Sequence, residues 1–270
     1  MLNYENFCHE IVTAVREAAL FITREYGRFD IRNTEIKGLN DFVSYVDKGS
    51  ESMLVENLGK ILPEAGFIAE EGTSSKMGMK YCWVIDPLDG TTNFLHGVHP
   101  FAISVALMED DEIVAGVVYE VCGKEIFYAW KNGGAWLNNQ QIHVSAAEHL
   151  TESLVATGFP YSDFSRLDDF MESLKHFCKT THGIRRFGSA SIDLAYVACG
   201  RFEAFYEYGL YPWDVAAGTL LVREAGGLVS DFSGNEKNIS GDEIAAASDL
   251  VFPEFLENIR KFMHRQIIQE

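Results

Sequence analysis

The stretch from Trp83 to Phe94 reads W-V-I-D-P-L-D-G-T-T-N-F, so an apolar run leads directly into two carboxylates and a Gly-Thr turn. The apolar run predicts a buried strand, whose end would anchor Asp86 and Asp89, with Pro87 restricting the backbone between them. Carboxylate and carbonyl oxygens are the ligands that Mg²⁺ prefers. The N–H groups of the Gly-Thr turn could meet an anion, especially if a helix begins there. The pattern alone is equally compatible with an ordinary turn, because Asp, Pro and Gly are common turn residues.

Three further segments place acids at the ends of structural elements. The apolar run F-I-A-E-E-G ends in Glu70 and Glu71, P-W-D-V-A-A-G places Asp214 near the start of a helix, and K-G-L-N-D-F-V-S-Y-V-D ends in Asp47, where a second helix is expected to begin. Taken singly, Asp47 and Asp214 could be plain helix N-caps, and the two glutamates could form a solvated turn. Their combination is more informative than any one of them.

Together these motifs resemble the inositol monophosphatase family of Mg²⁺-dependent, lithium-sensitive phosphatases. The resemblance covers nearly the whole chain: D-P-L-D-G-T-T-N-F, E-E-G, P-W-D-V-A-A-G, the G-S-A triplet that begins at Gly188, and Glu207, which stands seven residues before Asp214. Asn93 and Phe94 favour this family over the related nucleotide phosphatases, which usually carry Lys-Glu-Phe there. One departure is mild, since Ser44 stands where many relatives have Thr.

The family resemblance implies the sugar-phosphatase fold, a layered α/β architecture built as an α-β-α-β-α sandwich. The sequence pattern agrees. Apolar residues at helical spacing predict a helix over Tyr4–Tyr26, residues 101–142 read as an antiparallel meander of strands joined by hairpin turns, and strands alternate with helices beyond Thr151. We expect one compact unit of two halves, with residues 1–150 as the metal-binding α+β half and residues 151–270 as the α/β half that closes the substrate pocket.

By resemblance, the cofactor would be Mg²⁺, as two to three ions, and Mn²⁺ could substitute. Glu70, Asp86 and the backbone carbonyl of Leu88 would bind one ion, and Asp86, Asp89 and Asp214 would bind a second. A third, weaker ion would lie near Glu70. Two or more cations can neutralise phosphoryl oxygens, supply a nucleophile and stabilise the leaving group.

The resemblance implies hydrolysis of a phosphate monoester by metal-activated water. The catalytic set would be Glu70, Thr91, which would orient the water, and Asp47, which would accept its proton. The expected substrate contacts are Glu70, Leu88, Asp89, Gly90, Thr91, Arg185, Gly188, Ser189, Ala190, Glu207 and Asp214. Either arginine of the Arg185-Arg186 pair could approach the phosphate, and a surface salt bridge is an equally good interpretation of both; Arg185 is the one assigned to the site.

The expected substrate is inositol monophosphate, so the partner would be a small phosphorylated polyol. The nearer alternative is a phosphatase of the same fold acting on fructose-1,6-bisphosphate, histidinol phosphate or a 3′-phosphonucleotide. A more distant alternative is a regulatory or scaffold protein that retains the fold. The family also implies a homodimer, which the sequence alone does not show.

Composition limits the other possibilities. With 270 residues, 47% of them hydrophobic, the chain can bury a large core. A formal net charge of −18 argues against general binding to nucleic acid or to an anionic membrane surface, both of which favour basic proteins. The five cysteines form no C-x-x-C pair, which disfavours disulfides and a zinc site. No signal peptide or membrane span is recognised, so a cytoplasmic location is expected.

Overall fold

The computed structural model describes residues 3–30, 32, 34–38, 41–72, 80–161, 163–236 and 240–263, and of residues 36–38, 41 and 42 it describes only the backbone. Two residues of the acidic segment that leads to Asp47, Leu39 and Asn40, lie outside the described residues.

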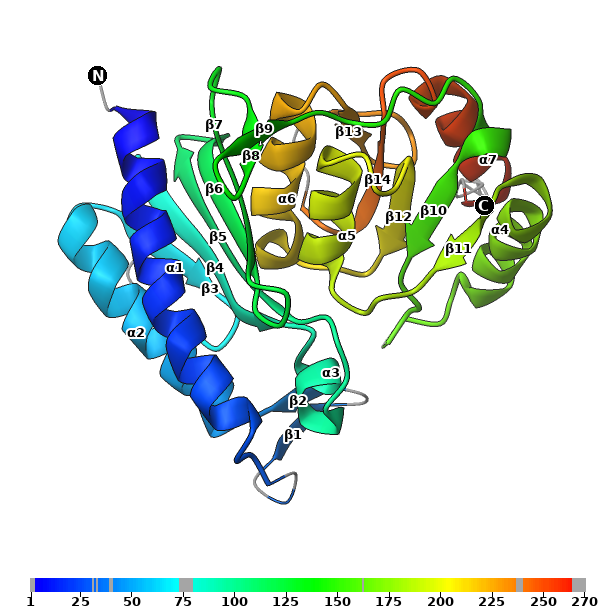
Figure 1. Ribbon diagram of the computed structural model, residues 1–270. Coiled ribbons are helices and arrows are strands. Elements are labelled where there is room, and N and C mark those ends of the chain that lie inside the picture. Colours follow the sequence, from blue (N-terminus) through cyan, green and yellow to red (C-terminus); the bar gives the residue numbers. More distant parts are fainter. Residues whose placement is uncertain are drawn as a thin grey trace, which may run out of the picture.

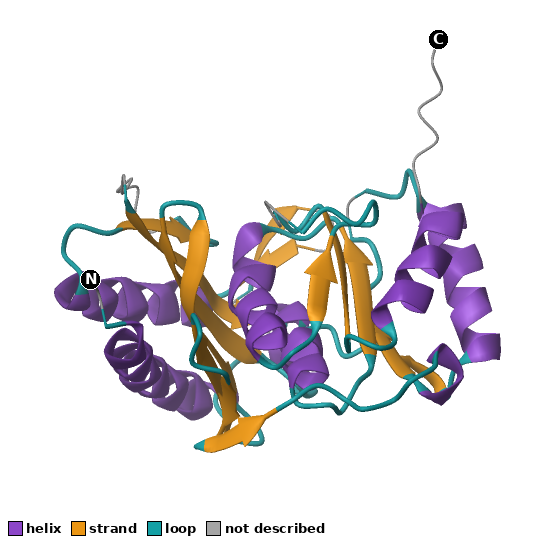
Figure 2. Cartoon of the chain, turned by 90° about the horizontal axis from the view of Figure 1, so that it is seen from above, coloured by secondary structure: helices purple, strands orange, loops and turns teal. Residues whose placement is uncertain are grey.

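The described chain forms five layers, seen side by side in Figure 1 and from above in Figure 2. Two helices cover the outer face of a seven-stranded sheet, two lie between this sheet and a five-stranded sheet, and two cover the outer face of the second sheet. In this order they are α1 (Tyr4–Tyr26) and α2 (Tyr45–Ile61), α5 (Ala190–Ala198) and α6 (Pro212–Glu224), and α4 (Leu167–Thr180) and α7 (Phe252–Met263). The predicted α-β-α-β-α sandwich is confirmed. The middle layer contacts both sheets, and the division of the chain near residue 150 stays a prediction.

The larger sheet has the strand order β3-β4-β5-β6-β7-β8-β9 among the described residues. Its strands are β3 (Gly66–Ala69), β4 (Tyr81–Asp89), β5 (Ala102–Glu109), β6 (Glu112–Glu120), β7 (Glu125–Trp130), β8 (Ala135–Leu137) and β9 (Gln140–Ile142). From β4 to β9 every neighbouring pair is antiparallel, as the meander predicted, whereas β3 and β4 are parallel.

The smaller sheet has the order β11-β10-β12-β14-β13 in the part of the chain that the structure describes. Its strands are β10 (Leu154–Thr157), β11 (Gly183–Arg185), β12 (Ala204–Tyr208), β13 (Leu228–Ser230) and β14 (Glu243–Ala247). Strands β11, β10 and β12 are parallel, and β14 pairs antiparallel with both β12 and β13. Three smaller elements complete the fold: the hairpin β1 (Glu35–Gly38) and β2 (Asp41–Val43), which the sequence did not predict, the short helix α3 (Thr91–His96), and a 3₁₀ turn at Leu150–Glu152.

Side-chain alternation along the strands produces the layers. On β5, Ile103, Val105 and Leu107 face the layer of α1 and α2, whereas Ala102 and Ala106 face α5 and α6. The small residues on the second face let α6 approach closely. A Cβ added at Gly116 of the neighbouring strand β6 would lie 3.1 Å from the Cα of Ala217 on α6. Each large aliphatic side chain buried in this way contributes about 1.5–3 kcal/mol.

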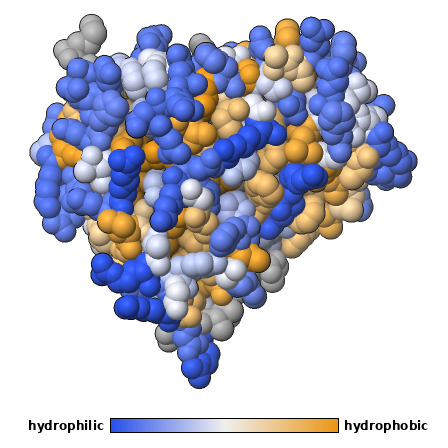
Figure 3. Space-filling model, viewed as in Figure 1, coloured by the Kyte–Doolittle hydropathy of each residue, from blue (hydrophilic) through white to orange (hydrophobic). Residues whose placement is uncertain are grey.

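The predicted first helix is confirmed with its predicted bounds. Its buried face includes Cys8, Ile11, Val15, Ala18 and Ile22, and the Asn3 side chain caps it by accepting the Asn6 N–H. On the face shown in Figure 3, hydrophilic residues cover most of the outer edges and hydrophobic residues show mainly toward the middle. No helix among the described residues is both long and apolar enough to cross a membrane.

Candidate active site

Strand pairing brings the first two predicted carboxylates together. Strands β3 and β4 run parallel, with Ala69 opposite Ile85, and the Glu70 N–H donates to the Ile85 carbonyl at 3.2 Å. Glu70 therefore lies beside the end of β4, next to Asp86. Repulsion between these two carboxyl groups is one of the causes that raise the pKa of Asp86.

An irregularity in β4 turns Asp86 and Asp89 toward the same site. Asp86 pairs with Ser104 and Asp89 with Ala102, so β4 has one more residue than β5 across this interval. Side chains three residues apart on a regular strand point to opposite faces of the sheet. The extra residue of a bulge brings the two side chains to the same face. Asp86 Oδ1 accepts the Leu88 N–H at 2.9 Å, which fixes the turn around Pro87.

Asp214 reaches the same place from the start of α6. Its Oδ2 accepts the Tyr211 N–H at 2.7 Å, which completes a capping box, and its carboxyl group shares a hydrogen bond with Asp86. The Ser104 hydroxyl of β5 donates to the Trp213 carbonyl at 3.2 Å, so the first turn of α6 is fastened to the sheet. Asp214 is therefore at position N3 of its helix, with Tyr211 as the N-cap, so the plain N-cap alternative is wrong and Asp214 joins the acidic group.

Asp89 connects the acidic group to the second half of the chain. Its Oδ2 accepts hydrogen bonds from the Ser189 hydroxyl at 2.7 Å, the Ser191 N–H at 2.8 Å and the Ser191 hydroxyl at 2.5 Å. The Ala190 N–H also donates to this carboxylate. The predicted Gly-Ser-Ala segment therefore lies at the site, at the first residues of α5.

The acids share a buried and strongly acidic environment. Burial raises the pKa of Asp86, Asp89 and Asp214, and mutual repulsion adds to the rise for Asp86 and Asp214. A divalent cation would relieve this repulsion, and hard carboxylate oxygens are the donors that Mg²⁺ prefers, so the residues fit the implied ion. In the described residues, no three His, Cys, Asp or Glu side chains form a ready-made ligand group. The side-chain oxygens of Asp86, Asp89 and Asp214 instead accept hydrogen bonds from N–H and hydroxyl groups.

The pair Asp47 and Thr91 lies beside this acidic group. The Thr91 hydroxyl is 2.9 Å from both Asp47 Oδ1 and the Leu88 carbonyl oxygen, and it has one proton to donate. Asp47 Oδ2 accepts the Ser44 N–H at 2.8 Å and the Ser44 hydroxyl at 2.6 Å. Burial raises the pKa of Asp47, and these bonds from Ser44 and Thr91 offset part of the rise. Ser44 thus supplies a hydroxyl and an N–H group that hold Asp47 in place.

Two residues of α2 hold the acidic loops and were missed from the sequence. The Ser50 hydroxyl donates to the Pro87 carbonyl at 2.9 Å, and Glu51 Oε2 accepts the Glu71 N–H at 2.7 Å. Ser50 and Glu51 follow Asp47 by three and four residues, so all three lie on one buried face of the helix. Polar residues at this spacing on an otherwise apolar face were the available signal.

Gly90 and Asn93 join the loop after β4 to the second half. Gly90 has φ +89°, and a Cβ there would lie 3.2 Å from the carbonyl oxygens of Gly188 and Pro100. The Asn93 side-chain amide donates to the Pro100 and Phe187 carbonyls, at 2.7 Å each. Position 90 therefore has little room for a side chain, and position 93 needs an amide for its two hydrogen bonds. Asn93 was not predicted as part of the site.

Glu207 faces the site from β12 of the smaller sheet. It is buried, and burial together with the nearby Asp89 raises its pKa to about 8, while Arg186 opposes this rise. A Cβ at Gly158 would lie 1.9 Å from Glu207 Oε1, so this carboxylate packs directly against the main chain.

The two arginines that follow Ile184 lie in different surroundings, and the predicted contact of Arg185 with substrate stays a prediction. Arg185 is exposed, and its guanidinium donates to the Ile184 carbonyl at 3.0 Å. Arg186 instead lies beside the buried acids, and its guanidinium donates to the Tyr161 hydroxyl. Neighbouring side chains of an extended segment point to opposite sides, so a step of one residue decides which arginine faces the site.

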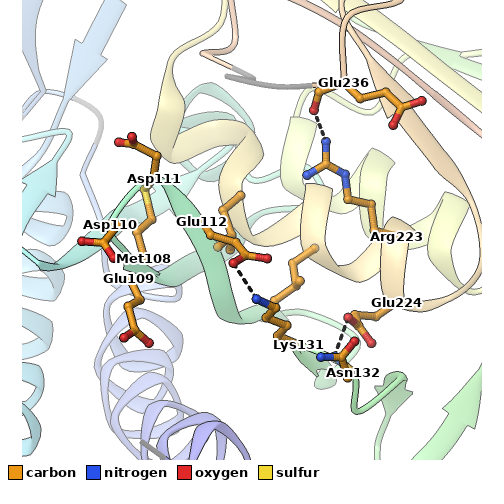
Figure 4. A pocket seen from close by; sticks show the side chains of 12 residues that line it. Met108, Glu109, Asp110, Asp111, Glu112, Lys131, Asn132, Arg223, Glu224 and Glu236 are labelled. Carbon is orange, nitrogen blue, oxygen red and sulfur yellow. Dashed lines mark hydrogen bonds and ion pairs between the residues drawn. The ribbon is translucent and has the colours of Figure 1, made fainter. Parts of the chain in front are cut away.

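A separate hollow of about 810 Å³ lies at the end of β5 remote from Asp86 (Figure 4). Its lining residues are Met108, Glu109, Asp110, Asp111, Glu112, Ile113, Lys131, Asn132, Leu220, Arg223, Glu224 and Glu236. Several of its charged groups bond within the lining, since Lys131 pairs with Glu112 at 2.5 Å and Arg223 donates to the Glu236 carbonyl at 2.5 Å. It is not part of the acidic site.

The layered architecture is that of the inositol monophosphatase structures, and the chain belongs to the inositol monophosphatase family, whose model matches residues 3–267. It is 42% identical over 254 residues to the "Putative Nus factor SuhB" of Neisseria meningitidis serogroup B, covering 94% of this chain and 97% of that protein. It is 36% identical to the "Inositol-1-monophosphatase" of Mesorhizobium japonicum, covering 93% and 95%. The inositol monophosphatase structure from Anabaena (Nostoc) sp. PCC 7120 matches with a TM-score of 0.87 and 31% identity, covering 97% and 98%.

These similarities confirm the predicted family and fold, and they support a phosphatase. The geometry brings Glu70, Asp86, Asp89 and Asp214 together and places Thr91 with Asp47 beside them. Their roles as metal ligands, catalytic residues and substrate contacts stay predictions.

Proposed function

We propose that this protein is a Mg²⁺-dependent phosphatase that hydrolyses inositol monophosphate to inositol and phosphate. The observation that carries the proposal is the gathering of Asp86, Asp89 and Asp214 into one buried group whose pKa values are raised, with the half-buried Glu70 beside Asp86. Glu70, Asp86, Asp89, Asp214 and the Leu88 carbonyl would hold two to three ions, for which Mn²⁺ could substitute. When bound, the ions would neutralise phosphoryl oxygens and make water a better nucleophile.

Thr91 and Asp47 orient and deprotonate the attacking water in this proposal. If the Thr91 hydroxyl gives its proton to Asp47, its oxygen lone pairs can accept a proton from a water molecule. Burial raises the pKa of Asp47 and so makes its carboxylate a stronger proton acceptor. The Ser44 bonds hold Asp47 in this orientation.

Groups from both halves would recognise the substrate. The N–H groups of Gly90 and Thr91 would bind phosphate, and Glu207 would accept hydrogen bonds from ring hydroxyls. Main-chain groups of Gly188 to Ala190 would contact the ring, and Arg186 takes the place assigned to Arg185. A buried acceptor built for hydroxyls discriminates against analogues that lack them. We further propose that the protein acts as a cytoplasmic homodimer without nucleic-acid or membrane partners.

The test is turnover of a panel of phosphate esters with Mg²⁺, with and without added Li⁺. The panel holds inositol 1-phosphate, fructose 1,6-bisphosphate, histidinol phosphate and a 3′-phosphonucleotide. Preferred, Mg²⁺-dependent hydrolysis of inositol 1-phosphate that Li⁺ inhibits would support the proposal. Asp249→Asn, at an exposed position, serves as the matched control for Asp86→Asn. Preference for another ester would show that the proposed substrate is wrong. Absence of hydrolysis with every ester would show that the proposed phosphatase activity is wrong.

A non-catalytic role is the second candidate, because a relative that is 42% identical carries the name Nus factor. The two candidates separate with one variant. A partner captured equally by the wild-type protein and by Asp86→Asn would support a scaffold role, since binding through an outer surface does not need the acidic group. A partner that binds the wild-type protein but not Asp86→Asn would argue against a scaffold role.

A further inference from the structure

Asp193 is a buried acid that was not predicted as a site residue and that has no role in the proposed reaction. It lies in the first turn of α5, three residues after Ala190, and only 1% of its surface is exposed. Its Oδ1 has no hydrogen-bond partner among the described residues. An unpaired buried carboxyl group is costly, so such a group calls for a physical reason.

Asp193 lies close to Glu207. On β12, Ala204, Tyr206 and Tyr208 face α4 and α7, whereas Phe205 faces the layer of α5 and α6. Glu207 is two residues after Phe205 and therefore faces α5 as well. Each of the two carboxyl groups lies within electrostatic reach of Asp89, and Glu207 also raises the pKa of Asp193.

Arg186 is the cation that acts on both carboxyl groups. Burial raises the pKa of Asp193 and of Glu207, and the Arg186 guanidinium offsets part of each rise. It lies over the rings of Phe159 and Tyr161, at 5.6 Å and 5.3 Å from their centroids, and its buried Nε has no hydrogen-bond partner among the described residues. The substrate side of the site thus holds the Arg186 guanidinium near Asp193 and Glu207, and among the described residues Arg186 Nε and Asp193 Oδ1 have no hydrogen-bond partner.

We propose that Asp193 is a specificity-determining positioning residue, which together with Arg186 orients Glu207 so that the site takes a neutral polyol monophosphate and rejects an ester with a second phosphate. This inference rests on the proposed function and names its substrate class.

Two physical arguments support the selection. A hydroxyl group both donates and accepts a hydrogen bond, so hydroxyls can satisfy the Arg186 donor and the carboxylate acceptors together. A second phosphate only accepts when it is fully ionised, and its negative charge would oppose ionisation of Glu207 and Asp193, whose pKa values burial already raises. Asp193 acts through its neighbours, because its own side chain is almost completely covered.

The experiment compares kcat/KM for inositol 1-phosphate, fructose 1,6-bisphosphate and p-nitrophenyl phosphate, with Mg²⁺, in full-length wild-type protein and Asp193→Asn. The substitution keeps the side-chain volume and removes the charge. We expect about a tenfold loss for inositol 1-phosphate, mostly through KM, a change within about twofold for p-nitrophenyl phosphate, and at least a tenfold rise in the ratio of bisphosphate to inositol phosphate turnover. Glu120→Gln, a buried acid of the larger sheet, is the control and should leave all ratios unchanged.

Thermal unfolding separates specificity from a structural role. Because Asp193→Asn replaces an acid whose ionisation burial disfavours and whose Oδ1 has no partner among the described residues, its Tm should equal or exceed that of the wild type. If the variant does not fold, Arg186→Lys tests the same group, with Arg201→Lys as its control, since Arg201 also stacks on a tyrosine and pairs with a carboxylate. Arg186→Lys should lower turnover of inositol 1-phosphate relative to p-nitrophenyl phosphate about tenfold.

The outcomes also separate this inference from the proposed function. Wild-type activity on inositol 1-phosphate with equal losses on all three esters, or with unchanged ratios, would overturn the role of Asp193 and leave the phosphatase intact. A wild-type protein that hydrolyses none of the esters would overturn both.

Discussion

Replacing Asp86 with Asn should stabilise the metal-free protein and abolish its activity. Asp86 is buried, shares a hydrogen bond with Asp214 and is repelled by Glu70, Asp89 and Asp214. Asn has nearly the same shape without the charge. The substitution therefore removes repulsion from the folded state while it removes the ligand that we assign to both tightly bound ions.

The size of the stabilisation follows from the geometry. Two like charges about 4 Å apart repel by about 4 kcal/mol at an effective dielectric constant of about 20. The carboxyl groups avoid part of this repulsion by holding protons, as their raised pKa values indicate. We therefore expect a gain of about 1–3 kcal/mol in the free energy of unfolding, or roughly 2–10 °C in Tm for a chain of this size.

Scanning calorimetry in EDTA near pH 8 measures this gain, and a Mg²⁺ titration follows. An ion at 100 times its Kd adds about 2.7 kcal/mol to the wild-type protein, so Mg²⁺ should reverse the order of the two Tm values. Turnover of inositol 1-phosphate by Asp86→Asn at saturating Mg²⁺ should fall by at least about 100-fold, since even the groups that support a ligand are worth 10- to 100-fold. Asp249→Asn should match the wild type in both measurements.

Two results would refute the reasoning. Near-normal turnover of Asp86→Asn at saturating Mg²⁺ would remove Asp86 from the metal site. A lower Tm for Asp86→Asn than for the wild type in EDTA would show that the folded protein stabilises the Asp86 carboxylate. Repulsion among the acids would then not destabilise the metal-free protein.

Three further predictions test other parts of the structure. The pKa of Glu207 is raised to about 8, so its proton stabilises the fold fully at pH below about 4.5, and this contribution is lost as the pH rises through 8. In EDTA, the Tm of Glu207→Gln should therefore decline less over this pH range than the Tm of the wild type. An equal decline in both proteins would contradict the burial argument. Asn93→Ala removes two buried hydrogen bonds and leaves two carbonyls unpaired, so urea unfolding should show a loss of about 2–4 kcal/mol, and a loss below about 0.5 kcal/mol would mean that the two halves do not depend on this amide. Burial raises the pKa of the Cys8 thiol to about 12 while Cys178 is exposed, so iodoacetamide at pH 8 should label Cys178 first by peptide mass spectrometry, and equal rates would place Cys8 outside the core.

The sequence predicted the parts of the fold that depend on local pattern. Apolar periodicity located α1, the turn residues marked the meander, and strand-end acids located the loop after β4. These signals are strong because each depends on neighbouring residues. The bulge between Asp86 and Asp89 was not predicted, since it appears only when β4 pairs with β5.

The residues that the sequence missed depend on tertiary contacts. Ser50 and Glu51 read as ordinary helix residues until their carbonyl and N–H partners, on loops far along the chain, are known. Asp193 reads as a polar residue of a short helix, and its burial appears only once α5 is packed between the two sheets. The choice of Arg186 over Arg185 depends on where a three-residue edge strand ends, which sequence patterns rarely fix to one residue.

These contacts imply different supports for the two sides of the site. On the first side, one helix face carries Asp47, Ser50 and Glu51, so α2 holds both acidic loops and Thr91 as a unit. The second side is attached through Asp89, whose Oδ2 accepts from Ser189 and Ser191. A cation that draws charge from Asp89 would weaken its hold on the start of α5. If Asp89 binds metal as we propose, metal binding and the position of the proposed substrate-binding residues would be coupled through this one carboxylate, because the same charge would serve both.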